Sequence, residues 1–258
     1  GVRGWVDRIK EVGGTMILSI DQGTTGTTVL VIDAEGEIKG RGYSEFRQIY
    51  PRPGWVSHNA NEIWDTTLQV TRVALRDAGI GSRDLAGIGI TNQRETAVMW
   101  DRNTGEPVAD AIVWQCRRTA DLCQKFKGQG LEPLVKERTG LVLDPYFSAT
   151  KVVWLLEHVE GLRAHSEGGD ICFGTVDSFL LFKLTGGEVH VTDPTNASRT
   201  MCYDIHKKTW DVELLEAFDI PGSALPSVQP SSGIFGHTVK HDDILEAGIQ
   251  IGGVAGDQ

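Results

Sequence analysis

A hairpin-like segment near the start of the chain restricts the possible folds more than any other feature. Two apolar runs, residues 16–20 and 29–32, have the length and the branched composition of buried strands. The segment between them, Asp21–Thr28, contains two glycines and four threonines. Glycine N–H groups and threonine hydroxyls can surround phosphate oxygens, and an acid at the strand end suits their Mg²⁺. An ordinary Gly/Thr hairpin capped by Asp21 explains the same residues, so a phosphate site needs support from elsewhere in the chain.

Length, charge and cysteine content exclude several protein classes. The 258 residues allow one large or two small domains, and 40% hydrophobic with 23% charged residues is typical of a soluble globular protein. No apolar run reaches about 18 residues and residues 1–15 lack an apolar signal core, so we expect no membrane span and no secretory signal. The net charge of −10 disfavours a nucleic-acid partner. The four cysteines form no C-x-x-C pair, which favours reduced thiols in a cytoplasmic protein and no zinc site.

The pattern that follows predicts an α/β fold. Residues 37–46 are strand-like and would complete an antiparallel meander with the first two strands. Asn59 and Glu62 resemble a capping box for a helix that ends near Gly79. Residues 85–91 and 249–256 are predicted as two further buried strands.

Several shorter elements are predicted between these strands. Residues 98–100 and 111–114 flank a turn and would pair as a hairpin. Ser148 is predicted to cap a helix that runs to residue 159. Residues 176–184 and 210–218 are predicted as helices, and residues 189–199 as a polar loop that closes over a site.

A polar run, Thr91–Thr96, follows the predicted strand 85–91. Open α/β sheets place ligand contacts at the carboxyl ends of their strands. Arg94 offers fixed donors and Glu95 two acceptor oxygens, so together they could hold vicinal hydroxyls of a small polyol. A surface salt bridge between the two is the competing interpretation.

Two aromatic residues could complete a polyol site. Trp114 could present a flat apolar wall to the CH face of a polyol, although core packing explains a single Trp equally well. Tyr146 precedes the helix that begins near Ser148, where its hydroxyl could reach a ligand.

Acidic residues follow the two strands with the strongest apolar signal. Asp21 ends the first strand and Asp257 ends the last. If these strands are neighbours in one sheet, both carboxylates face the same crevice, where one could serve a metal and the other accept a proton.

Several polar segments occur in a characteristic order over residues 16–258: residues 21–25, 91–96, 111–115, 145–151, 191–193, 196–200 and 256–258. Together they resemble the glycerol kinases of the FGGY carbohydrate kinase family, and residues 92–96 resemble the glycerol-specific members rather than pentulose kinases. The resemblance implies a ribonuclease H-like α/β fold of the actin, hexokinase and Hsp70 superfamily, with a mixed sheet flanked by helices. It implies ATP-dependent phosphorylation of glycerol to glycerol 3-phosphate with Mg²⁺, in a cytoplasmic protein that is a homo-oligomer at full length.

The resemblance also implies roles for individual residues. Arg94 and Glu95 would bind the glycerol hydroxyls, Trp114 would form a wall for the carbon backbone, and Tyr146 would add a hydroxyl contact.

Phosphoryl transfer would use the residues at the ends of the first and last predicted strands. Asp257 would be the general base on the attacking hydroxyl, with Gln258 beside it. Asp21 would lie near Mg²⁺, and the phosphates would run along Gly23, Thr24 and Thr25. These assignments agree with the requirements of phosphoryl transfer, which are alignment of the reacting groups and neutralisation of charge.

Two departures from the family pattern concern the phosphates and regulation. Thr28 stands where the family usually has an arginine near the phosphates, which we expect to weaken phosphate binding or to shift that duty elsewhere. Residues 244–248 lack the Gly-Gly-x-Arg pattern linked to inhibition by fructose 1,6-bisphosphate, so we expect that regulation to be absent.

Both ends of the chain also carry expectations. We interpret residues 1–15 as a leader or cloning remnant and residues 16–258 as the N-terminal, substrate-binding domain. A C-terminal nucleotide-binding domain would be missing, so the chain alone would turn over slowly. Three alternatives stay open: another FGGY sugar or polyol kinase, a non-catalytic nucleotide-binding domain of the actin/Hsp70 kind, and a degenerate fragment with neither activity.

Overall fold

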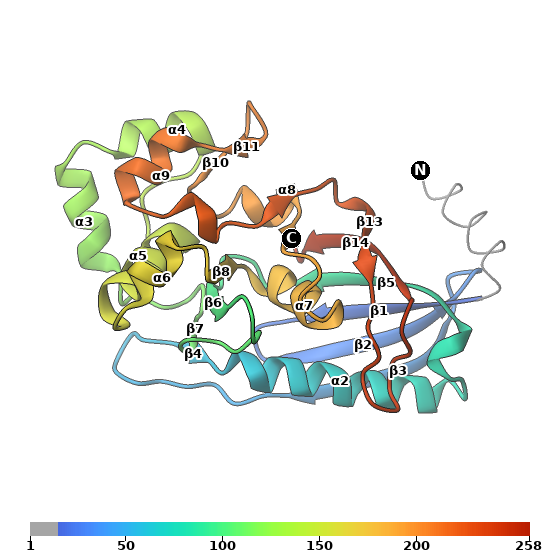
Figure 1. Cartoon of the computed structure of the whole chain (residues 1–258). Helices are drawn as coiled ribbons and strands as arrows, with labels where there is room; N and C mark the ends of the chain where they lie inside the picture. Colours follow the sequence, from blue (N-terminus) through green and yellow to red (C-terminus); the bar gives the residue numbers. More distant parts are fainter. Residues whose placement is uncertain (1–14) are drawn as a thin grey trace.

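A six-stranded mixed sheet forms the centre of the molecule (Figure 1). The computed structural model describes residues 15–258, so all but the last residue of the predicted leader lies outside the described residues. The strand order is β13-β14-β5-β1-β2-β3, in which β1, β5 and β14 are parallel and the other pairings are antiparallel. The strands are β1 (Met16–Gln22), β2 (Gly26–Asp33), β3 (Ile38–Glu45), β5 (Leu85–Asn92), β13 (Ser232–His237) and β14 (Gln250–Gly256). The predicted meander and the predicted mixed α/β sheet flanked by helices are confirmed.

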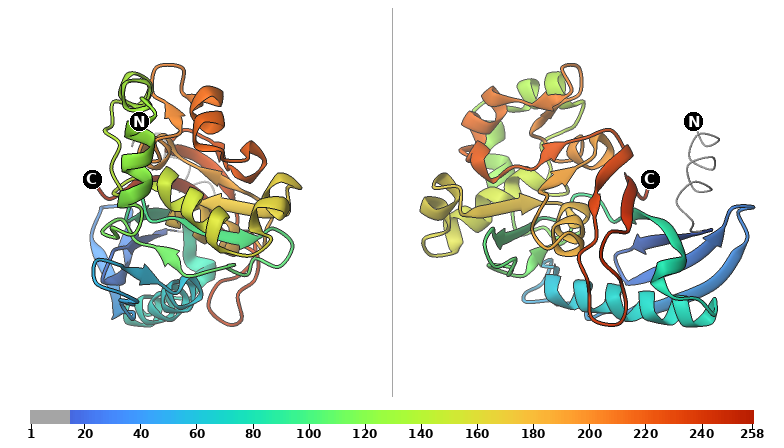
Figure 2. Two further views of the ribbon diagram at one scale, coloured as in Figure 1. Left: turned by 90° about the vertical axis from the view of Figure 1, so that its left-hand side faces the viewer. Right: turned by 45° about the vertical axis from the view of Figure 1, so that its right-hand side comes forward.

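Two helices, α2 (Ala60–Asp77) and α7 (Val176–Leu184), pack against the apolar residues of this sheet. Alternate residues of β1 and β2 are fully buried there: Leu18, Ile20, Val29 and Val31. Figure 2 shows α2 running along the strands. It approaches β3 closely, since a Cβ on Gly42 would lie 2.4 Å from the Val70 carbonyl oxygen. Asp21, on the opposite side of β1 from Leu18 and Ile20, is exposed.

A second core lies among helices at the left of Figure 1. These helices are α3 (Ala120–Gly128), α4 (Glu132–Thr139), α5 (Ser148–His158), α6 (Leu162–Glu167) and α9 (Val212–Phe218). The antiparallel pair β6 (Val98–Asp101) and β8 (Ile171–Gly174) separates the two cores. Trp100 of β6 packs into the sheet core and its neighbour Met99 into the helical core, so this pair is apolar on both faces.

The predicted hairpin of residues 98–100 with 111–114 forms only as isolated bridges, and the strands themselves pair elsewhere. β6 pairs with β8, and β7 (Ala111–Ile112) pairs with β4 (Ser57–His58). The two sides of the 102–105 turn are joined by single bridges, Ala97 with Ile112 and Trp100 with Pro107, and by hydrogen bonds from the Val108 N–H to the Met99 carbonyl and from the Asp101 N–H to the Glu106 carbonyl. The long-range partner is preferred because β8 offers a full antiparallel ladder and apolar side chains for both cores.

The predicted polar loop of residues 189–199 is wrong. It contains β9 (Val191–Thr192), paired with β12 (Ser227–Val228), and the short helix α8 (Pro194–Ala197). Asp193 caps α8 by accepting hydrogen bonds from the N–H groups of Thr195 and Asn196. Polarity here reflects buried hydrogen bonding rather than exposure, since Asp193 and Asn196 are fully buried.

Two helix starts differ from prediction, and the cap of a third is formed only in part. Asn59 does cap α2, but the Glu62 carboxylate accepts from the Arg47 N–H, so the capping box is half formed. Phe147 occupies the cap position of α5, because the Ser148 hydroxyl donates to Glu95 instead. The helix predicted over residues 210–218 begins at Val212, since Trp210 belongs to β11 (Thr209–Trp210), which pairs with β10 (Tyr203–Asp204).

Within residues 15–258 we find no helix with the length and apolar character needed to cross a bilayer.

Candidate functional site

The carboxyl ends of three parallel strands lie side by side at one edge of the sheet. In the strand register Asn92 of β5 lies beside Gln22 of β1 and beside Gly256 of β14. The Gln93 N–H donates to the Gln22 carbonyl at 2.7 Å, and the Asp257 N–H donates to the Asn92 carbonyl at 3.1 Å. These bonds continue the sheet past its last residues, so the side chains that follow each strand emerge at one place.

Asp21 and Asp257 lie at this edge on two strands that are separated by β5. They are therefore next-nearest strands rather than the neighbours that we considered from the sequence. Partial burial and the negative charge of Asp257 raise the pKa of Asp21, so the two carboxylates are within electrostatic reach. Both residues are exposed, which leaves them accessible to a ligand at the strand ends.

Arg94 contacts the end of β14 rather than Glu95. Its side chain is 13% exposed, and its Nε lies 3.8 Å from Oδ1 of Asp257. Its Nη2 donates to Oε1 of Gln258 at 3.3 Å. The guanidinium group therefore lies between the polar run after β5 and the acid at the end of the chain.

Glu95 is buried, with 2% of its surface exposed. Its φ of 62° is in the left-handed region, which is strained for a residue with a long side chain. Two contacts hold it there: the Ser148 hydroxyl donates to its carbonyl oxygen at 3.0 Å, and Arg199 Nε donates to its Oε1 at 2.6 Å. The surface salt bridge between Arg94 and Glu95 is thus excluded, because Glu95 is buried and pairs with a distant arginine.

Trp114 and Tyr146 pack against each other with their ring planes tilted by 53° and their ring centroids 5.3 Å apart. Both are partly exposed, so core packing does not account for the whole of either ring. The indole Nε1 of Trp114 donates to the Thr24 hydroxyl at 2.8 Å, which connects the aromatic wall to the β1–β2 hairpin.

The β1–β2 hairpin has backbone N–H groups that donate to no acceptor among the described residues. The Gly23 N–H donates to the Gly26 carbonyl at 3.0 Å, and the carbonyls of Gly23 and Thr24 accept from the Gln93 and Gln48 amides. Among the described residues no group accepts a hydrogen bond from the N–H of Thr24 or Thr25. Free N–H groups beside a carboxylate suit phosphate oxygens.

Comparison with known proteins decides the family. Residues 16–258 match the model of the N-terminal domain of the FGGY family of carbohydrate kinases. This chain belongs to that family. It is 54% identical over 242 residues to glycerol kinase 2 of Thermotoga maritima and 57% identical over 243 residues to the glycerol kinase of Methylobacterium nodulans. In both cases the match covers 94% of this chain and 48% of the relative, so the chain spans about half the length of these curated relatives.

Solved structures agree with the fold. A crystal structure of Plasmodium falciparum glycerol kinase with ADP superposes with a TM-score of 0.88 at 33% identity, over 94% of this chain and 48% of that one. Gluconate kinase from Lactobacillus acidophilus superposes with a TM-score of 0.83 over the same shares, but at 20% identity it supports the fold alone. The fold class expected from the sequence, that of the actin and hexokinase superfamily, is confirmed.

Sequence reasoning gave no role to two cations in this FGGY site. Lys151 is fully buried, and its ammonium donates to the carbonyls of Pro145, Tyr146 and Phe147. Burial lowers the pKa of Lys151 to about 7. The Arg199 guanidinium lies over the rings of Tyr146 and Phe147 in the same turn. Lys151 therefore contacts this turn through its carbonyl oxygens, and Arg199 contacts it through its aromatic rings.

Asp193 is the third feature that sequence reasoning missed. Its carboxylate accepts from the hydroxyls of Thr195 and Ser231 and from the Asn196 amide. The pair Asp193-Pro194 is a helix-start signal, an N-cap followed by proline, and could have located α8.

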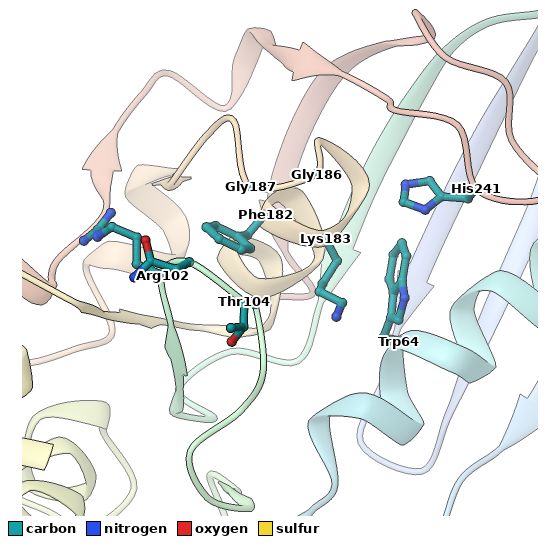
Figure 3. A pocket seen from close by; sticks show the side chains of 10 residues that line it. Trp64, Arg102, Thr104, Phe182, Lys183, Gly186, Gly187 and His241 are labelled. Carbon is teal, nitrogen blue, oxygen red and sulfur yellow. The ribbon is translucent and has the colours of Figure 1, made fainter. Parts of the chain in front are cut away.

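A separate cavity of about 540 Å³ lies elsewhere in this FGGY domain (Figure 3). Residues of α2, α7 and the β13–β14 connection line it, among them Trp64, Lys183 and His241. None of the strand-end residues described above contributes to its wall. We retain the strand ends as the candidate functional site because they carry several charged and polar groups at the edge where open sheets bind ligands.

Proposed function

We propose that the full-length enzyme phosphorylates glycerol with ATP to give glycerol 3-phosphate, and that this chain supplies the polyol half of the site. The observation that supports this most directly is that the Arg94 guanidinium lies 3.8 Å from the Asp257 carboxylate and within electrostatic reach of the buried Glu95 carboxylate. A nucleotide-binding scaffold of the actin/Hsp70 kind would need the phosphate hairpin but not this cluster. The identity to curated glycerol kinases favours glycerol over other polyols.

Substrate binding follows from hydrogen-bond chemistry. Arg94 donates to a hydroxyl oxygen, and Glu95 accepts from hydroxyl protons. Trp114 and Tyr146 form the apolar wall for the CH groups, and the Tyr146 hydroxyl adds a polar contact. Gln258, which Arg94 already contacts, completes the polar side.

The transfer step assigns the proton to Asp257. The terminal hydroxyl oxygen attacks the γ-phosphorus of ATP, the bond from that phosphorus to the bridging β,γ oxygen breaks, and ADP leaves. The proton of the attacking hydroxyl passes to the Asp257 carboxylate, which acts as general base. Arg94, whose Nε lies 3.8 Å from Oδ1 of Asp257, keeps that carboxylate in place.

The phosphates would lie along Gly23, Thr24 and Thr25, where the N–H groups of Thr24 and Thr25 are available to bind an anion. Asp21 would serve a Mg²⁺ that neutralises charge on the phosphates. Mg²⁺ keeps several waters and takes few protein ligands in such sites. The exposed Asp21 carboxylate at the end of β1 offers an oxygen ligand of the kind that Mg²⁺ prefers.

Cytoplasmic localisation and a homo-oligomeric state of the full-length protein remain proposals. Cell fractionation tests the first, and light scattering of the purified full-length protein tests the second.

A coupled assay of ADP release tests the function. The full-length protein should turn over glycerol at least about 10²-fold more efficiently, as kcat/KM, than pentuloses and pentitols. Calorimetry of glycerol binding should show a heat that is lost in Arg94→Ala and retained in Arg83→Ala, a change of an exposed arginine paired with Glu246. No ADP release with any polyol would refute the proposal, and a preference for a pentulose would reassign the substrate.

A further inference from the structure

We propose that Arg199 is a positioning residue for the polyol site, which fixes the Glu95 carboxylate and the Tyr146 ring in the arrangement that receives the substrate. The proposal rests on the function proposed above.

Arg199 contacts three neighbouring parts of the site with one guanidinium group. Its Nε lies 2.6 Å from Oε1 of Glu95. Its Cζ lies 5.6 Å from the ring centroid of Tyr146 and 4.9 Å from that of Phe147. A planar guanidinium can stack on rings while donating along its edge, which an ammonium cannot do. Arg199 therefore joins the acceptor group and the aromatic wall of the site.

The segment that carries Arg199 is attached to the strand ends. The Arg199 N–H donates to the Asn196 carbonyl at 3.0 Å, and the Asn196 amide donates to Oδ1 of Asn92, the last residue of β5, at 3.1 Å. The neighbouring Thr195 hydroxyl accepts from the Gly256 N–H at 2.7 Å. The backbone at Arg199 is thus fixed to β5 and β14, so its guanidinium has a defined position relative to Arg94 and Asp257.

The ionisation of Glu95 depends on this contact. Burial raises the pKa of Glu95, and the hydrogen bond and charge of Arg199 oppose that rise. Arg94 and Lys151 are the other charged groups that face this carboxylate, and both also favour its ionised form. An ionised carboxylate only accepts hydrogen bonds, whereas a protonated one must use an oxygen as donor. Arg199 therefore keeps Glu95 as an acceptor for substrate hydroxyls.

The test is the pH dependence of the glycerol KM in the full-length enzyme. Arg199→Gln should raise KM about 10-fold or more at the acidic end of the pH profile, with the increase shrinking as the pH rises and Glu95 ionises without its partner, while kcat stays within a few-fold. Arg199→Lys keeps the charge but loses the planar stacking, so its KM should rise by a constant factor over the same pH range. Burial lowers the pKa of Lys151 to about 7, so each variant is compared with the wild type at the same pH.

Arg138→Gln is the matched control. Arg138 is also 27% exposed in its side chain, and its Nε lies 3.6 Å from the buried Asp211; neither residue belongs to the proposed polyol site. Removing it leaves a buried carboxylate without its partner, as Arg199→Gln does, so it reproduces the general loss of stability. Its glycerol KM should follow the wild-type pH profile.

Three results would overturn the proposal. They are a ratio of KM between Arg199→Gln and wild type that does not change with pH, a wild-type KM in Arg199→Lys, and the same pH-dependent KM in Arg138→Gln. If Arg199→Gln fails to fold, the Arg199→Lys result alone decides. A wild-type enzyme with no glycerol turnover would instead refute the proposed function, so the two failures are distinguishable.

Discussion

The backbone of Gly256 lies directly against the side chain of Arg94. A Cβ added to Gly256 would lie 2.2 Å from Cδ and 2.6 Å from Cγ of Arg94. Any side chain at the last residue of β14 would therefore displace the guanidinium from its position beside Asp257 and Gln258. Gly256 is required here for close approach rather than for an unusual φ.

Gly256→Ala in the full-length enzyme should raise the glycerol KM about 10-fold or more, because Arg94 must move. The melting temperature should change little, since the clash is with a side chain at the sheet edge. Gly253→Ala is the control, because the nearest atom to its added Cβ, the Ser231 carbonyl oxygen, is 3.8 Å away. An unchanged KM in Gly256→Ala would show that Arg94 does not bind the substrate from this position.

Asp257→Asn should lower kcat by about 10² or more while the glycerol affinity stays within a few-fold, because an amide cannot accept the hydroxyl proton. Steady-state kinetics with calorimetry separate the two quantities. Asp243→Asn, which changes an exposed acid paired with Arg72, should leave both unchanged. If kcat in Asp257→Asn stays near the wild-type value, Asp257 is not the base.

Thr24→Val should raise the KM for both glycerol and ATP by about 2- to 10-fold. The substitution keeps the shape of the side chain but removes the oxygen that accepts from Trp114 Nε1 at 2.8 Å. Because this bond joins the aromatic wall to the phosphate hairpin, its loss should affect both substrates. An effect on ATP alone would mean that Trp114 holds its place without Thr24.

Asp177→Asn should stabilise the protein at neutral pH. Asp177 is fully buried in α7, and burial raises its pKa to about 7 although the Thr175 and Thr192 hydroxyls donate to it. Between the ordinary aspartate pKa of 3.8 and the raised pKa of about 7 the folded state keeps a proton that the unfolded state loses, so the contribution of Asp177 to stability falls as pH rises through that window.

Urea unfolding from pH 4 to 8 measures this effect. The variant should gain about 1–3 kcal/mol over wild type at pH 8, and the gain should vanish toward pH 4. Asp243→Asn should show the opposite direction, because Arg72 lowers the pKa of Asp243 and that contribution is present above its unfolded pKa. A gain in Asp177→Asn that does not depend on pH would mean that Asp177 is ionised in the folded state throughout.

Local patterns predicted the parts of this fold that local forces control. The β1–β2 hairpin, the third strand, α2 and α7 follow from alternation, helical spacing and caps, each of which depends on residues within about one turn of one another. The strand ends at Asp21, Arg94 and Asp257 were located for the same reason, because a polar run that follows an apolar strand is visible in the sequence.

Pairing between distant segments was not predictable in this way. β6 pairs with β8 rather than with the nearby β7, because β8 alone completes a strand pair with apolar side chains on both faces, between the two cores. Nothing in the sequence near residue 98 indicates that partner. The polar pattern of residues 189–199 predicts a loop, because buried and exposed polar residues look alike in a sequence.

The sequence by itself determined which chemical groups this protein presents at its strand ends, because short-range patterning sets where strands stop and polar residues begin. Only the tertiary structure decided which groups pair. Glu95 pairs with Arg199 rather than with its neighbour Arg94, since the left-handed turn at Glu95 sends the two side chains to different partners. That choice depends on contacts between residues more than one hundred positions apart, whose free energies appear only when the chain is folded.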